Sequence, residues 1–139
     1  MVFDKLRRLS LLILLIPRQF VRTDGSLVDF DFEAWSSSEY RWDQDAWSGL
    51  HDFAQEVEET LERGHGDCED YAVVAASWAL QNGREDVGLA LCWEWPYPWS
   101  RHVIAYDADR VYSSGTIFQG SVDEWVDQSR YFYALERPV

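Results

Sequence analysis

LERGHGDCEDYA, residues 61–72, is the stretch of sequence that decides the fold. Its Gly-x-Gly pair interrupts the chain, and Asp67 followed three residues later by Asp70 has the pattern of a helix N-cap and its capping partner. The sequence therefore predicts a helix that begins at Cys68 and ends at Asn82-Gly83.

One side of this predicted helix, residues 68–80, carries small side chains. The i, i+4, i+7, i+8 spacing aligns them on a single stripe, which comprises Cys68, Ala72, Ala75, Ala76 and Ala79. Small side chains let a helix sit close against a sheet. We therefore expect the cysteine to lie at the N-terminal end of a buried helix face.

The segments before the glycine break are predicted from their periodicity. Residues 51–63 place apolar side chains at helical spacing with glutamates on the other face, which predicts a helix that ends near Gly64. Residues 26–35 alternate with a period of two, which predicts a short strand or an extended arm. The three serines at 36–38 predict a loop.

Strands are predicted after the cysteine helix, because large apolar residues alternate with smaller ones between turn signals. The predicted strands are 87–93, 102–106, 110–113 and 131–135. Residues 95–99, WPYPW, predict a rigid aromatic loop, and Asp107–Arg110 predicts a tight turn. Ser121 with Glu124 predicts a capped turn or short helix. Helices followed by a mostly antiparallel meander indicate the α+β class.

The composition bounds the class of protein. The chain has 139 residues, 47% of them hydrophobic, which is enough for one core and too little for two ordinary domains. Its net charge of −13 makes a duplex nucleic acid a poor candidate partner, because a phosphate backbone requires a basic patch. Lys5 is the only lysine in the sequence. Strong acidity with so little lysine suggests a salt-rich, halophilic setting, and an ordinary acidic protein is the alternative.

Residues 1–25 are predicted to form an apolar, basic arm, and residues 26–139 a single domain. The run LSLLILLI at 9–16 is too short to span a bilayer as a helix, which needs ~20 residues. No small-x-small cleavage site follows it, which disfavours a removed secretory signal and favours an intracellular or virion-associated setting. The arm would pack on the chain's own core, on a membrane surface or on a partner chain. We favour a partner chain, bound through residues 1–22.

The two cysteines, Cys68 and Cys92, do not make a disulfide framework, although one bridge between them is possible. Cys92 alternates with large apolar residues on a predicted strand and is assigned to the core. No second pair of Cys or His has zinc-ligand spacing, so we predict neither a metal nor a cofactor.

Cys68 has the position of a nucleophile at the start of its helix. A thiol attacks as the thiolate, and both a helix N-terminus and an imidazole such as that of His102 lower a thiol pKa. Nearby like charges oppose this effect, and they belong to Asp67, Glu69 and Asp70. The alternative is that a lone cysteine on an alanine stripe is only a small buried hydrophobe.

Residues 61–72 closely resemble the nucleophile motif of the bacterial transglutaminase-like cysteine proteinase family, whose architecture is papain-like. In that motif a helix end and a Gly-x-Gly-Asp break precede Cys-Glu-Asp-Tyr-Ala, which opens the core helix. Arg101–Ala105, RHVIA, looks like the strand that begins with the family's catalytic histidine, and Tyr131–Leu135 is similar to its last strand. The resemblance covers about residues 45–137 and implies a papain/transglutaminase-like fold.

The resemblance also implies roles for site residues: Cys68 as nucleophile and His102 as general base, then acid. The family places an Asp on the strand after the histidine strand, to orient the imidazole. A two-residue turn at Ala108-Asp109 puts Ser113 at that place, as a diagonal neighbour of His102. A serine hydroxyl accepts from an imidazole N–H but does not stabilise imidazolium by charge, and losing the carboxylate costs up to ~10⁴ in rate in a serine triad.

Four tryptophans are candidate substrate-binding residues: Trp47, Trp93, Trp95 and Trp99. Trp47 precedes the nucleophile at a distance where family members place groups that line the site, and its indole N–H could serve an oxyanion. The other three run directly into His102 and could form an aromatic wall for a peptide or glycan. Core filling is the alternative for all four.

Two functions follow as hypotheses. The first is a cysteine peptidase, amide hydrolase or acyl transferase that acts on a protein or peptide substrate through Cys68 and His102. The second is a structural or interaction component of a larger assembly, such as a virus tail or particle, that kept the fold and lost the activity. Ser113 and the apolar arm favour the second.

Overall fold

The computed structural model describes residues 17–42, 57–94 and 97–139. Its helical segments are η1 (Pro17–Gln19), α3 (Phe32–Ala34), η2 (Trp35–Glu39), α4 (Val57–Arg63), α5 (Cys68–Gln81) and α6 (Val122–Gln128). Its strands are β1 (Arg41–Trp42), β2 (His65–Gly66), β3 (Gly88–Glu94), β4 (Tyr97–Tyr106), β5 (Arg110–Ser113), β6 (Thr116–Gln119) and β7 (Tyr133–Pro138).

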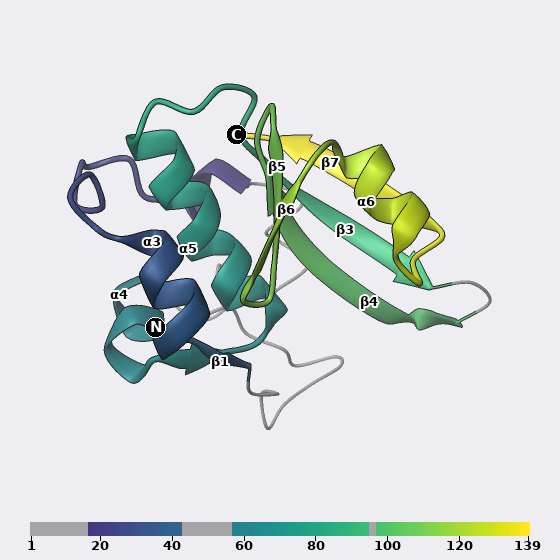
Figure 1. Ribbon diagram of the computed structural model, residues 1–139, viewed down its shortest axis with the longest axis horizontal. Coiled ribbons are helices and arrows are strands. Elements are labelled where there is room, and N and C mark those ends of the chain that lie inside the picture. The colour runs from purple at the N-terminus through teal and green to yellow at the C-terminus, as the bar shows by residue number, and fades with distance from the viewer. Residues whose placement is uncertain (1–16, 43–56, 95–96) are drawn as a thin grey trace.

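One five-stranded sheet organises these elements (Figure 1). Its strand order is β6-β5-β4-β3-β7, and every neighbouring pair is antiparallel. The strands β1 and β2 form a separate parallel pair. The predicted α+β class with a small, mostly antiparallel sheet is therefore confirmed.

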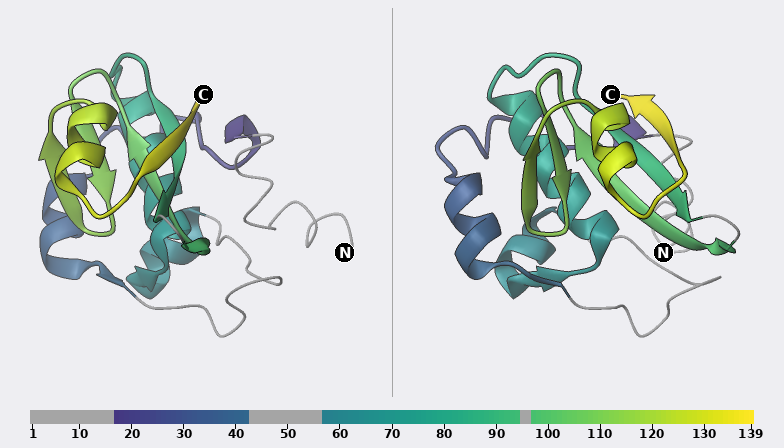
Figure 2. Two further views of the ribbon diagram at one scale, coloured as in Figure 1. Left: turned by 90° about the vertical axis from the view of Figure 1, so that its right-hand side faces the viewer. Right: turned by 45° about the vertical axis from the view of Figure 1, so that its right-hand side comes forward.

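Helices cover both faces of the sheet. In the right-hand view of Figure 2, α6 lies in front of the sheet and α5 behind it. The strands divide their side chains between the two layers by their period of two. The buried side chains under α5 are those of Leu89, Leu91, Val103, Ala105 and Tyr112. Those under α6 are Ala90, Cys92, Ile104, Tyr106 and Val111.

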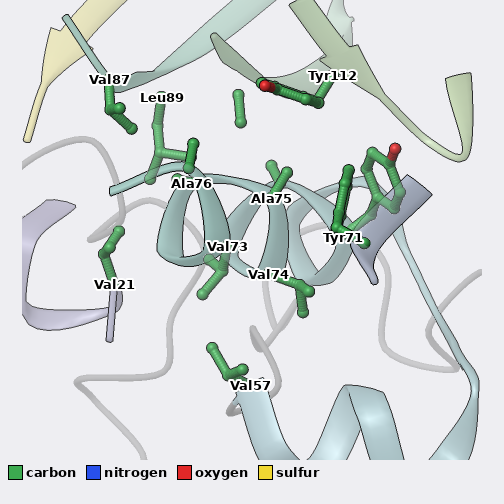
Figure 3. Close-up of a cluster of buried hydrophobic side chains, with 14 of the residues drawn as sticks. Val21, Val57, Tyr71, Val73, Val74, Ala75, Ala76, Val87, Leu89 and Tyr112 are labelled. Atoms are coloured by element: carbon green, nitrogen blue, oxygen red, sulfur yellow. The ribbon is translucent and has the colours of Figure 1, made fainter. Parts of the chain in front are cut away.

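The core under α5 depends on small helix residues, as the stripe predicts. Ala72, Ala75, Ala76 and Ala79 are fully buried. Figure 3 shows Ala75 and Ala76 between the helix and the sheet, below Leu89 and Tyr112. On the other side of the helix, Val57 of α4 closes the same core. Because the side chains between helix and sheet are small, the two backbones lie close together. A larger side chain at one of these positions would therefore have no space.

Contacts at the C-terminal end of α5 show how this helix is oriented along β3. The N–H of Val139 donates to the carbonyl of Val87 at 3.0 Å, and Val139 lines one hollow with Leu80, near the C-terminal end of α5. The start of β3 therefore lies at the C-terminal end of α5. The end of β3, at Trp93, points towards Cys68.

Predicted elements after residue 56 are confirmed in most cases. The helix predicted over 51–63 is present as α4 in its described part, and residues 51–56 lie outside the described residues. The cysteine helix, the strands 87–93 and 110–113 and the capped helix after Ser121 all form close to their predicted bounds. The hairpin register is also as predicted, with Ala105 opposite Tyr112.

The predicted strand at 26–35 and loop at 36–38 are wrong. The chain turns over Asp24–Asp29 and then forms α3 and η2. The side chain of Asp31 accepts the N–H of Ala34 at 3.1 Å and so caps a helical turn. Phe32 and Trp35, three residues apart, are both buried by that turn. The large apolar side chains of this segment are therefore buried by a helical turn and not by a strand.

Three further predictions differ from the structure around the sheet. Residues 97–99, part of the predicted aromatic loop, belong to β4, which pairs with β3 from Glu94–Tyr97 onward. The strand β6 was not predicted, because it follows a turn at Ser114-Gly115 in which both residues have positive φ. The last strand starts at Tyr133 and ends at Pro138, two to three residues later than predicted.

Residues 1–16 lie outside the described residues, so the docking of the arm on a partner stays a prediction. The described part of the arm packs on the domain. Val21 is buried in the core, and the N–H of Arg22 donates to Ser77 Oγ of α5 at 2.9 Å. Within the described ranges, no helix is both long enough and apolar enough to cross a membrane.

Asp107 ties the β4–β5 turn to the loop after α5. This residue is 5% exposed, and its carboxylate accepts the N–H groups of Asp109 and Arg110 at 2.9 Å each. The Tyr112 hydroxyl donates to it at 2.5 Å, and Arg84 forms an ion pair with it. Burial acts to raise the pKa of this carboxyl, but its hydrogen bonds and the Arg84 charge hold that pKa below its ordinary value.

We expect Asp107→Asn to lower the free energy of unfolding by about 2–4 kcal/mol, because it removes a buried charge from its partners. In the wild type the stabilisation is complete above the unfolded-state pKa of ~3.9 and is lost as the pH falls through the lower folded-state pKa. Urea unfolding as a function of pH measures both effects. Asp109→Asn is the matched control, since its side chain is 79% exposed and its change should stay within about 0.5 kcal/mol. Equal effects of the two variants would contradict the anchoring role of Asp107.

We also expect Ala76→Leu to destabilise the protein by about 1–3 kcal/mol or more, because overpacking forces the helix off the sheet. Thermal or urea unfolding measures the change. Ala34→Leu, at an exposed position of α3, serves as the control and should change the stability by less than about 0.5 kcal/mol. If Ala76→Leu is neutral, the helix and sheet are not in close contact at this position.

Candidate active site

Cys68 is the first residue of α5, and its neighbours fix the start of that helix. The Asp67 carboxylate accepts the N–H groups of Glu69 and Asp70 at 3.1 and 3.2 Å. The Asp70 carboxylate in turn accepts the N–H of Asp67 at 3.0 Å. The predicted capping box is therefore confirmed. Cys68 itself is partly exposed.

The surroundings of the thiol are rich in carboxylates. Asp67, Glu69 and Asp70 are 7%, 8% and 2% exposed. Their negative charge opposes a thiolate at Cys68, and Asp67 already occupies two of the N–H groups at the positive end of α5. The helix end therefore lowers the thiol pKa less than an end without these carboxylates would.

Tyr40 supports the loop that leads into Cys68. Its hydroxyl donates to the carbonyl of Gly66 at 2.9 Å and lies 3.3 Å from that of Asp67. Burial raises the pKa of Tyr40, and the charge of a thiolate at Cys68 raises it further. The Tyr40 hydroxyl is thus a neutral donor close to the nucleophile position. Nothing in the sequence pattern marks it.

His102 and Ser113 are brought together as the hairpin register predicts. His102 Nε2 lies 2.7 Å from Ser113 Oγ, which is hydrogen-bond distance. The serine therefore holds the imidazole at one of its two nitrogens. No carboxylate takes part in this bond, so it orients the ring without stabilising a positive charge on it.

Aromatic rings enclose the imidazole of His102. The ring of Tyr131 stacks on it at 5.3 Å between centroids and 11° between planes, and Trp125 of α6 stacks at 6.2 Å and 26°. Burial lowers the pKa of His102 to about 4, and the charge of Arg130 acts in the same direction. The imidazole is therefore neutral at physiological pH.

The ring of His102 lies on the α6 face of the sheet. Its direct cross-strand partner is Cys92, and Ile104, two residues further along β4, is buried under α6. Cys68, by contrast, begins a helix that covers the opposite face. Cys92 is fully buried, as predicted for a core residue, and burial raises its pKa to about 12. Cys92, the cross-strand neighbour of His102, is therefore not expected to act as a nucleophile.

The end of the sheet nevertheless connects His102 to the start of α5. Ser113 contacts His102, and two residues later Gly115 makes a backbone hydrogen bond to the hydroxyl of Tyr71, one helical turn after Cys68. β4 pairs with β5 at Ala105 and Tyr106, so His102 lies beyond that pairing, where the β5–β6 turn meets α5.

Tyr131 gives a second connection between the two faces. Its ring stacks on His102. Burial raises its pKa, the hydrogen bond and charge of Arg130 act to lower it, and the charges of Cys68 and Cys92 act to raise it. The structure thus brings Cys68 and His102 to the same end of the sheet, from opposite faces. Their direct pairing as nucleophile and base stays a prediction.

The predicted aromatic wall is described in part. Trp93 is half-buried against the α5-side core, which also includes Cys68, and it stacks on Tyr133. Trp47 and Trp95 lie outside the described residues. The backbone of Trp99 belongs to β4, and the position of its side chain is not described.

Sequence reasoning missed three of the aromatic residues at this end: Tyr40, Trp125 and Tyr131. Trp125 lies four residues after the Ser121 N-cap, so helical spacing could have placed it on the buried face of α6. Tyr40 follows a serine run, and Tyr131 falls in the predicted last strand without any signal of a site, so only the fold brings them together.

Among the residues that the structure describes, no group of three His, Cys, Asp or Glu side chains could hold a metal ion. The reactive groups described at this end of the sheet are the thiol of Cys68, the imidazole of His102 and the hydroxyl groups around them. No family model, curated protein or solved structure matches the chain, so its own residues and their geometry carry the functional interpretation.

Proposed function

We propose that this protein is a transglutaminase-like cysteine hydrolase or acyl transferase that acts on amide bonds. The observation that carries the proposal is the hydrogen bond between His102 Nε2 and Ser113 Oγ, at the end of the sheet where Cys68 begins α5. It is supported by the resemblance of residues 61–72 to the nucleophile motif of that family. Cys68 is the nucleophile and His102 the base, and Ser113 positions the base.

The bond to Ser113 is compatible with either tautomer of His102, because a serine hydroxyl both donates and accepts. The proposed mechanism uses the tautomer in which Nε2–H donates to Ser113 Oγ, so that Nδ1 carries the lone pair and takes the thiol proton from Cys68. This step requires the imidazole or the helix end to shift, because the two residues come from opposite faces of the sheet.

The remaining steps follow from the same groups. The thiolate adds to the amide carbonyl carbon, and the oxyanion that forms lies near the backbone N–H of Cys68. Nδ1–H then protonates the leaving amine, the C–N bond breaks, and a thioester remains on Cys68. Water, or a second amine, attacks the thioester while Nδ1 accepts its proton, and this releases the acyl product and the free thiol.

A second candidate function is an inactive component of a larger assembly that kept this fold. Two observations favour it: the low pKa of His102 and the serine in place of a carboxylate. A neutral imidazole does not hold a thiolate–imidazolium pair at rest, and the carboxylates around Cys68 add to the cost of a thiolate. Under this function residues 1–22 bind the partner chains.

The reactivity of Cys68 towards iodoacetamide tests the proposed function. It is followed by intact mass as a function of pH. For an enzyme we expect an apparent pKa below the ~8.5 of a free thiol, because the helix end and His102 both favour the thiolate. His102→Gln should slow alkylation at neutral pH by about tenfold or more, the scale of a lost general base.

Cys92→Ala is the matched control, since Cys92 is fully buried and its removal should leave the reaction of the native protein unchanged. A pH profile like that of glutathione, unaffected by His102→Gln, would rule out an activated Cys68 and leave the assembly component as the function.

A second prediction uses Ser113→Asp, which adds the carboxylate that the related family places there. The new charge should raise the pKa of His102 by about 1–3 units, measured by NMR titration of its ring protons. For an enzyme the alkylation rate of Cys68 at neutral pH should rise with it. Ser113→Ala, which removes the hydrogen bond without adding charge, should produce neither increase.

The two readouts of Ser113→Asp separate the two functions. If the pKa of His102 rises while the rate at Cys68 stays constant, the imidazole and the thiol do not communicate. That result would contradict the catalytic pair and support the inactive component.

A further inference from the structure

A row of three side chains crosses the sheet beside the start of α5: Tyr133 on β7, Trp93 on β3 and Arg101 on β4. Trp93 is the direct cross-strand partner of both of the others, so all three point to the same face. The next row inward, Leu135, Leu91 and Val103, has the same orientation, and its Leu91 and Val103 lie in the core under α5.

The outer row is more exposed to solvent than the inner row that α5 covers. Leu91 and Val103 of the inner row are 6% and 3% exposed, whereas Tyr133 is 51% exposed and Arg101 is also exposed. Because the end of β3 points towards Cys68, the row lies at the Cys68 end of α5 and on the face that this helix covers. It is therefore on the same side of the sheet as the thiol.

The chemistry of the row is specific. Trp93 and Tyr133 stack at 5.8 Å between centroids and 22° between planes, so the row contains an aromatic pair. Arg101 adjoins it and makes no ion pair with any of the described residues. Its planar fork suits a carboxylate from outside the chain.

We propose that this row binds the acyl side of the substrate of Cys68, as a peptide with an aromatic side chain followed two residues later by an acidic one. The proposal rests on the function proposed above. Neighbouring strands lie about 4.8 Å apart, so a ring centred over the Trp93–Tyr133 pair is about 7 Å from the β4 strand of Arg101. In an extended peptide, side chains two residues apart lie about 6.6 Å apart on one side, which matches that spacing.

The test is a binding titration of the full-length protein, labelled with ¹⁵N, by Ac-Phe-Gly-Glu-amide. The reporter is the indole N–H signal of Trp93, identified as the signal that Trp93→Phe removes. We expect this signal to shift with saturation. Ac-Phe-Gly-Gln-amide and Ac-Ala-Gly-Glu-amide should each bind about fivefold or more weakly, because each lacks one of the two recognised groups.

Two variants of exposed residues connect the binding to the row. Tyr133→Ala and Arg101→Gln should each weaken binding of Ac-Phe-Gly-Glu-amide by about fivefold or more. Phe132→Ala is the matched control: its ring is 70% exposed and adjacent in sequence but outside the row, so binding should change by less than about twofold. Saturating peptide should also slow alkylation of Cys68, because the proposal makes the row a subsite of the thiol.

The remaining outcomes overturn the proposal. They are no shift of the Trp93 signal at millimolar peptide, equal affinity for all three peptides, or a shift with maltose and none with peptide, which would indicate a glycan surface. Binding without any protection of Cys68 would show that the row is not a subsite of the thiol. The indole readout does not use the reactivity of Cys68, so it can succeed or fail independently of the alkylation profile.

Discussion

The packing of α5 on the sheet is the contact on which the rest of this structure depends. The alanines of α5 leave its backbone close to β3 and β4, and this closeness decides which face of each strand is buried. It also fixes the direction of the helix, with Leu80 near the start of β3 and Cys68 near its end. The thiol, the imidazole and the row of Tyr133, Trp93 and Arg101 all occupy one end of the molecule as a consequence.

The start of α5 combines two requirements that oppose each other. A stable helix end needs its N–H groups paired, and Asp67 and Asp70 provide this through the capping box. A reactive thiol at Cys68 needs positive potential at the same end, which those carboxylates reduce. Residues 67–70 therefore set the balance between helix stability and thiolate stability. Any further stabilisation of a thiolate has to come from the imidazole of His102.

The position of His102 separates the two candidate functions in physical terms. Its bond to Ser113 and its stacking on Tyr131 hold the ring firmly, which suits a positioned base. The same partial burial lowers its pKa to about 4, and the strand register places it on the face away from α5, which suits a packing residue. An enzyme therefore has to bring His102 and Cys68 together, beyond the last paired residues of β4 and β5, whereas an inactive scaffold needs no such movement.

Local sequence was sufficient for the elements whose causes are local: the capping box at Asp67, the alanine stripe of α5, and the hairpin whose turn placed Ser113 beside His102. The tertiary structure decided the rest, because burial by distant segments outweighs local periodicity. Residues 26–35 alternate like a strand but form turns, since Asp31 caps a helical turn and the core takes Phe32 and Trp35 together. The face on which His102 lies, and the neighbours Tyr40 and Tyr131 at the site, depend on contacts between segments far apart in the chain, which no local pattern encodes.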